Sequence, residues 1–135
     1  MDKETLENYR YLKKEIRLLE QRIDRLHTPL SDRVTASNSE FPYQEVHLYV
    51  EGVDIKKQAL EEILRKRLAE CLDETIRIED FISSIEDSRT RMIFQRRYID
   101  GWPWIRISVI LGSKSESYAR MIHDRILKKT CDWED

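Results

Sequence analysis

Two stretches of the chain repeat apolar residues at alternating spacings of three and four, and this pattern limits the fold more than any other feature. The first stretch carries Tyr9, Leu12, Ile16, Leu19, Ile23 and Leu26, and the second carries Leu64, Leu68, Cys71, Thr75, Ile78, Ile82 and Ile85. This spacing lines one side of a helix, which must then bury that stripe against another helix. The pattern predicts helices over about 3–27 and 54–85, paired as an antiparallel hairpin, as a dimerising coiled coil, or as both.

Residues 28–53 read as a linker between these helices. Pro29 ends the first helix because proline disfavours helical geometry in the residue before it, and Asp54 is a good N-cap for the second helix. Within the linker, Val46, Leu48 and Val50 alternate with other residues. This alternation predicts a short strand-like arm over 46–52.

Residues 86–135 read as three shorter helices. Asp87 or Ser88 caps the first helix, and Asp100–Gly101 ends it. Pro103 suits the first position of the second helix, where its missing N–H costs nothing, and Gly112 suits the C-terminal cap.

The third helix is predicted over about 114–129, opened by a capping box in which Ser113 pairs with Glu116. Positions expected to face the core of this module are Met92, Ile93, Phe94 or Tyr98, Trp104, Ile107, Leu111, Ala119, Ile122 and Ile126. The sequence therefore predicts an all-α protein. A long N-terminal helical hairpin or coiled coil (1–85) serves association, and a trihelical helix-turn-helix domain (86–135) follows it.

Charge is distributed unevenly along the chain. The net charge is −2 overall, but residues 89–129 hold ten Lys or Arg against three Asp or Glu, a local charge of +7. Residues 1–88 hold 14 Lys or Arg against 20 Asp or Glu, a local charge of −6. A basic module joined to an acidic one is expected of a chain with two different partners.

Several classes of function lack their signals in the sequence. There is no Gly-rich phosphate loop, nucleophile elbow or zinc-protease motif, so no enzymatic activity and no cofactor are expected. The three histidines stand far apart without ligand spacing, so no metal is expected. Two widely spaced cysteines read as reduced thiols. Without a leader or an apolar run of 18 residues, the chain is expected to be cytoplasmic and not membrane-bound.

The basic module has the layout of a helix-turn-helix DNA reader, in which the second helix of the pair enters the major groove. The positions expected to face the groove are Lys114, Ser115, Ser117, Tyr118 and Arg120. Three further cations, Arg106, Arg125 and Lys128, are better placed for phosphates. We expect phosphate contacts to dominate the affinity.

Residues 112–129, with the sequence GSKSESYARMIHDRILKK, resemble the recognition helix of region four of sigma-70-type factors, the domain that reads the −35 promoter element. Together with the FPY-containing linker and the RRYIDGWPW block, the layout is similar to that of small phage and prophage transcriptional regulators of the ArpU/RinA type. The close match covers roughly 87–129, about a third of the chain.

The sequence departs from the sigma pattern at the base-reading positions. An Arg-Glu pair, with Gln one turn later, is typical of the sigma recognition helix, whereas Glu116, Ser117 and Met121 occupy the matching positions here. A bidentate arginine contact to guanine is therefore missing at Glu116. The resemblance implies a phage-specific target in place of the ordinary promoter hexamer.

These features predict a phage-encoded regulator of transcription that binds double-stranded DNA in the host cytoplasm, at the nucleoid. The acidic helical half is expected to form a homo-oligomer, with a dimer presenting two half-sites, or to contact host RNA polymerase. Two alternatives stay open. One is a small terminase subunit that binds packaging-site DNA, and the other is a protein-interaction module that contacts polymerase without binding DNA.

Overall fold

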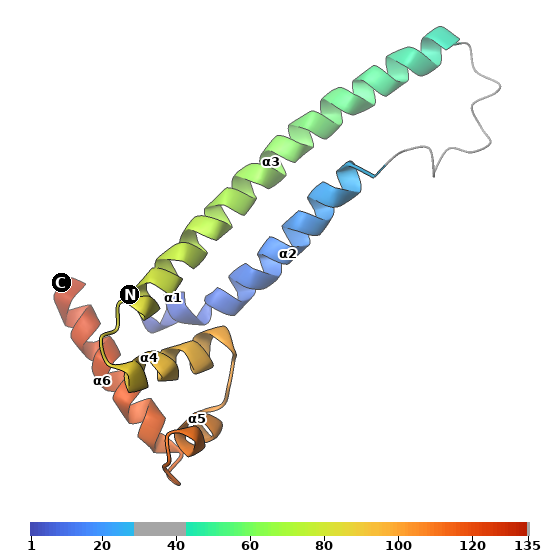
Figure 1. Ribbon diagram of the computed structural model, residues 1–135. Helices are drawn as coiled ribbons and strands as arrows, with labels where there is room; N and C mark the ends of the chain where they lie inside the picture. Colours follow the sequence, from blue (N-terminus) through green and yellow to red (C-terminus); the bar gives the residue numbers. More distant parts are fainter. Residues whose placement is uncertain (29–42, 135) are drawn as a thin grey trace. The chain divides into compact units, whose positions relative to one another are not determined.

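A computed structural model (Figure 1) describes the backbone of residues 1–28 and 43–134 and the side chains of residues 1–28 and 52–130. Every regular element within these ranges is helical. In chain order they are α1 (Lys3–Glu7), α2 (Tyr9–Leu26), α3 (Tyr43–Ser83), α4 (Ser88–Phe94), the π-helical turn η3 (Gln95–Ile99), α5 (Trp104–Ile110) and α6 (Ser117–Glu134). The all-α prediction is confirmed.

The chain divides into two compact units, and the division differs from the boundary expected near residue 85. The first unit consists of Met1–Glu15 and Cys71–Asp135, and the second consists of Ile16–Glu70. The helices α2 and α3 each contribute to both units. The first fifteen residues and the last part of α3 therefore belong with the C-terminal module.

The predicted apolar seams are the buried faces of α2 and α3. The buried seam residues are Tyr9, Leu12, Ile16, Leu19 and Ile23 in α2, and Leu64, Cys71, Thr75, Ile78 and Ile82 in α3. In the first unit the hydroxyl of Tyr9 donates to the carboxylate of Glu79. In the second unit His27 Nε2 lies 2.8 Å from Glu61 Oε1. Both contacts join the two helical segments within one chain, as in a helical hairpin.

The predicted arm over 46–52 is wrong, because these residues belong to α3, which begins at Tyr43 and not at Asp54. Extending a helix adds one hydrogen bond for each residue fixed. An alternation of only three apolar residues does not favour a strand strongly enough to outweigh these additional helical hydrogen bonds. Of the expected linker 28–53, residues 29–42 lie outside the described part of the chain, as does the side chain of Cys131.

The first predicted helix is divided at Asn8 into α1 and α2. The carboxylate of Asp2 caps α1 by accepting from Thr5 N at 2.8 Å. Asn8 N still donates to Glu4 O, and Leu12 N donates to Asn8 O. Helical hydrogen bonding thus continues through the division.

The C-terminal part of the first unit has a core built by α4, α5 and α6. Ile93, Ile107 and Ala119 are buried at its centre. The partly buried side chains packed around them are Trp102, Trp104, Leu111 and Ile122. Met92 was expected in this core, but it is 39% exposed. Its neighbours Ile93 and Phe94 occupy the buried side of α4 instead, so the Met92 assignment is wrong.

The first helix of this module is not a regular α-helix to its end. From Gln95 to Ile99 the backbone forms a π-helical turn, and Asp100 N donates to Gln95 O at 3.2 Å. Gly101 follows with φ of +74°, a conformation that glycine adopts without a steric penalty. The predicted stop at Asp100–Gly101 is confirmed, and the π turn is an addition that the sequence pattern did not indicate.

Candidate nucleic-acid interface

Two turns define the ends of α5. Pro103 precedes the helix as its N-cap residue and does not occupy the first helical position, which is Trp104. At the other end Gly112 has φ of +87°, as predicted for a C-terminal cap. Gly112 N donates to Val109 O at 3.0 Å, and Ser113 N donates to Ser108 O at 2.9 Å. These two bonds are those of a Schellman motif, which satisfies the last carbonyls of a helix.

The start of α6 is held by a side chain of α5. The hydroxyl of Ser108, which is fully buried, accepts from Ala119 N at 3.1 Å and donates to Glu116 O at 3.3 Å. Ala119 N is one of the donors that the first turn of a helix leaves without an intrahelical partner. The orientation of α6 against α5 is therefore fixed by a hydrogen bond as well as by apolar packing.

The predicted capping box does not form. Ser113 Oγ accepts from Ser115 N at 3.2 Å, one residue short of the Glu116 N–H that a capping box requires. The helix α6 begins at Ser117 and runs to Glu134, whereas 114–129 was predicted. Lys114, Ser115 and Glu116 consequently lie in the turn before α6 and not on it.

Residues on α6 divide into a buried and an exposed side. Ala119, His123 and Leu127 are buried, and Ile122 and Ile126 are partly buried. The predicted contact residues Arg120, Met121, Arg125 and Lys128 are all exposed, and at helical spacing they share the opposite side. Lys114, Ser115 and Glu116 in the preceding turn and Arg106 on α5 are exposed as well.

Two of the predicted contact residues are only partly accessible. Ser117 and Tyr118 are half-buried. The hydroxyl of Tyr118 accepts from Arg89 Nη1 at 3.0 Å, which ties α6 to α4. Ser117 Oγ lies 3.0 Å from Ser115 Oγ. Their polar groups thus already have partners inside the protein.

The exposed cations of this face form no ion pair with the carboxylates that the structure describes. Among the described residues, no carboxylate lies within 4.0 Å of the side-chain nitrogens of Arg106, Lys114, Arg120, Arg125 or Lys128, whereas Arg89 and Arg96 in α4 and η3 do have such partners. An unpaired cation is available to an anionic ligand without the cost of breaking an ion pair. The α6 face therefore carries cations that no ion pair of the described residues neutralises.

Two arginines, Arg96 and Arg106, stack on the ring of Trp102. The sequence alone did not predict this arrangement. The guanidinium carbon of Arg106 lies 3.8 Å from the centre of the Trp102 ring, and that of Arg96 lies 4.4 Å from it. Arg96 Nη1 also donates to Asp100 Oδ2 at 3.0 Å. Such stacking restrains a long flexible side chain. Arg106 is therefore held in place at the start of α5.

His123 belongs to the buried core and not to the exposed face of α6. It is fully buried, its Nε2 is bonded by the hydroxyl of Tyr98, and its Nδ1 lies 2.9 Å from Asp124 Oδ1. The rings of Phe94 and Trp104 pack against it. Burial lowers the pKa of His123, so the ring is neutral at neutral pH. No group of three or more potential metal ligands occurs among the side chains that the structure describes.

Comparison of the chain with known protein families, with characterised proteins and with solved structures found no match. Along the helices that the structure describes, none combines the length and the apolar character needed to cross a bilayer.

Proposed function

We propose that the chain is a DNA-binding regulator of transcription and that α5, the turn at Gly112 and α6 act as its helix-turn-helix. The observation that carries this proposal is the face of unpaired cations on a helix whose start is fixed. Helix-turn-helix proteins place the N-terminal residues of the second helix in the major groove, while the first helix contacts the backbone. Arg120 lies in the first turn of α6, Lys114 lies in the turn before it, and Arg106 lies on α5.

The proposed mechanism is non-catalytic. Arg106, Arg125 and Lys128 bind phosphates and set the position of α6, since most hydrogen bonds in such complexes go to the backbone. Ser115, Glu116 and Met121 then meet base edges. Glu116 favours cytosine, whose amino group is a donor in the major groove, over guanine. The target is accordingly a site of the phage genome that differs from the sigma hexamer.

The proposal is tested by the affinity of the full chain for fragments of its phage genome at about 50–100 mM salt. We expect Lys114→Ala combined with Arg120→Ala to weaken binding. The slope of log affinity against log salt should change little, because the phosphate contacts are assigned to Arg106, Arg125 and Lys128. Fluorescence anisotropy measures both quantities. The circular dichroism spectrum should stay that of the wild type, because both side chains are exposed.

The matched control removes two cations from the hairpin, as Lys66→Ala with Arg77→Ala, which are exposed on α3. This control should keep the wild-type affinity and salt slope. Equal effects of the two double variants would mean that only net charge matters and that the α6 face is not the binding surface.

A second candidate function is contact with a protein such as host RNA polymerase. Ile105 and Val109, four residues apart on one side of α5, are 54% and 61% exposed. Exposed apolar groups that cluster in this way are typical of protein-binding surfaces. If the wild-type chain binds no duplex, and Val109→Lys abolishes its co-migration with RNA polymerase, the protein-interaction function is favoured over DNA binding.

A further inference from the structure

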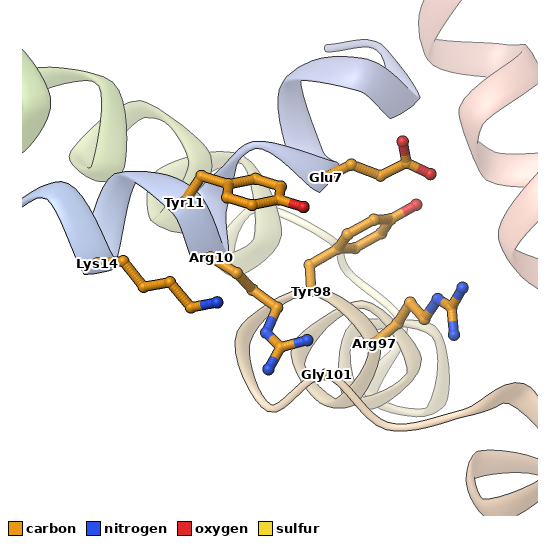
Figure 2. Close-up of a pocket in the computed structure, with 7 residues that line it drawn as sticks. All are labelled: Glu7, Arg10, Tyr11, Lys14, Arg97, Tyr98 and Gly101. Atoms are coloured by element: carbon orange, nitrogen blue, oxygen red, sulfur yellow. The ribbon is translucent and has the colours of Figure 1, made fainter.

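A cationic pocket lies away from the α6 face, where the start of α2 meets the end of η3 (Figure 2). Its volume is about 340 Å³. Three cations line it, Arg10 and Lys14 from α2 and Arg97 from η3, together with Tyr11 and Tyr98. Glu7 is the acidic residue of the lining. The lining therefore carries a net charge of +2, which the sequence analysis did not anticipate because these residues are distant in sequence.

Gly101 allows this arrangement. A Cβ atom at this position would lie 2.5 Å from Cζ of Arg10, which is closer than real contacts allow. The guanidinium of Arg10 thus rests on the backbone of the turn, and Figure 2 shows Arg10 and Lys14 reaching from α2 toward Gly101. The left-handed conformation of Gly101 and the absence of a side chain there both contribute to the shape of the pocket.

The cations of the pocket are held in place and are not neutralised. Arg97 Nη1 donates to Trp102 O at 3.1 Å, and its guanidinium carbon lies 4.5 Å from the centre of the Trp104 ring. No carboxylate of the described residues comes within 4.0 Å of the side-chain nitrogens of Arg10, Lys14 or Arg97, since Glu7 pairs with Lys3 instead. A guanidinium that is already oriented loses less conformational entropy when a ligand binds, so the free-energy cost of binding is smaller.

Guanidinium groups bind phosphate through two parallel hydrogen bonds, and an ammonium group adds a point charge. We propose that this pocket binds a phosphate group. The group is either a backbone phosphate of bound DNA or the phosphate of a free small molecule. Only the DNA source rests on the function proposed above. In that case the pocket adds a contact to the DNA backbone, in addition to the contacts made by α6 and the turn before it.

The test compares the full wild-type chain with Arg10→Gln combined with Lys14→Gln, both exposed positions. The first measurement is thermal unfolding in sodium pyrophosphate against sodium chloride of equal ionic strength. A free phosphate ligand should raise the midpoint of the wild-type chain by about 3 °C or more and leave that of the pocket variant unchanged. The second measurement is duplex affinity against salt. A backbone ligand should make the log–log slope of the pocket variant smaller by about two.

The matched control is Lys13→Gln combined with Arg17→Gln, which removes the same charge from exposed positions of α2 that do not line the pocket. The control should behave as the wild-type chain in both measurements. The inference is overturned if the pocket variant and the control agree in both. A wild-type chain that binds no duplex contradicts the proposed function, and the pyrophosphate measurement then decides the pocket alone.

Discussion

His123 occupies a fully buried position in a module otherwise rich in exposed charge. In its neutral form Nδ1–H donates to Asp124, and Nε2 accepts from the hydroxyl of Tyr98. On protonation the Tyr98 hydroxyl would turn so that its oxygen accepts from Nε2–H, and a positive charge would then lie inside the core. Desolvation of the ring favours the uncharged imidazole, and it outweighs the hydrogen bond to Asp124, which favours the charged form.

This environment predicts a pH dependence of stability. Burial lowers the pKa of His123 below its ordinary 6.5, so below that pH the unfolded chain binds more protons than the folded chain. The contribution to the free energy of unfolding is present above pH 6.5 and is lost as pH falls from there through the lowered pKa of the folded state. Urea unfolding at several pH values measures this loss, and His123→Gln should make the dependence flatter over the same range. A variant with the full wild-type dependence would contradict the assignment to His123.

Two serine hydroxyl groups accept backbone N–H groups at the start of α6. Ser108 and Ser113 lie five residues apart and both accept a backbone N–H, but the N–H of Ala119 is buried, whereas that of Ser115 is exposed. A buried donor that loses its partner costs its full desolvation, whereas an exposed donor turns to water. The two serines therefore contribute unequally to the α5–α6 corner.

We expect Ser108→Ala to lower the free energy of unfolding by about 1–3 kcal/mol, and Ser113→Ala to lower it by no more than about 0.5 kcal/mol. Urea denaturation followed by circular dichroism measures both values. A larger cost at Ser113 than at Ser108 would show that α6 is capped locally, as the sequence pattern indicates.

The α3 helix offers a matched pair of isoleucines for the hairpin. Ile78 lies on the buried seam with 1% of its surface exposed, while Ile76 lies on the outer side with 62% exposed. Truncation of a buried isoleucine removes apolar contact and leaves a cavity. Ile78→Ala should therefore cost about 2–5 kcal/mol of unfolding free energy, and Ile76→Ala about 0.5 kcal/mol or less. Similar costs for both would mean that the outer side of α3 is also covered in solution.

At the scale of the whole molecule, the apolar seams of α2 and α3 are buried within one chain. These seams are therefore not free to pack against a helix of another chain. An assembly of several copies would have to use other surfaces. A regulator that reads two half-sites needs a dimer, whereas a packaging subunit of the small terminase type forms a large ring. Assembly size separates the two functions.

We expect light scattering coupled to size exclusion to give a mass no greater than that of two 16.3 kDa chains. Two copies suffice to place one recognition helix on each half of a symmetric site. An assembly of eight or more chains would favour DNA packaging over regulation. The measurement needs no variant, and dilution of the sample distinguishes a dimer from a monomer.

The helical elements and most of their ends follow from the sequence, because the signals that specify them are local. The seam spacing on α2 and α3, the cap at Asp87, which accepts from Thr90 N, and the positive φ at Gly112 each depend on residues within a few positions. For the same reason the exposed cations of α6 could be proposed as a face from the sequence alone. The sequence pattern failed where two local signals competed, as at 46–52.

Tertiary structure decided the features that join residues distant in sequence. The hydroxyl of Ser108 accepts from Ala119 N, whereas a capping box of Ser113 and Glu116 was expected; Arg106 stacks on Trp102, and Arg10 rests on Gly101. Each of these contacts requires two segments to be packed before the groups meet, and neither residue type nor spacing specifies which hydroxyl or ring will be nearest. Local hydrogen bonding and periodicity determine where helices form, whereas the shape of the packed core determines which polar groups they bring together.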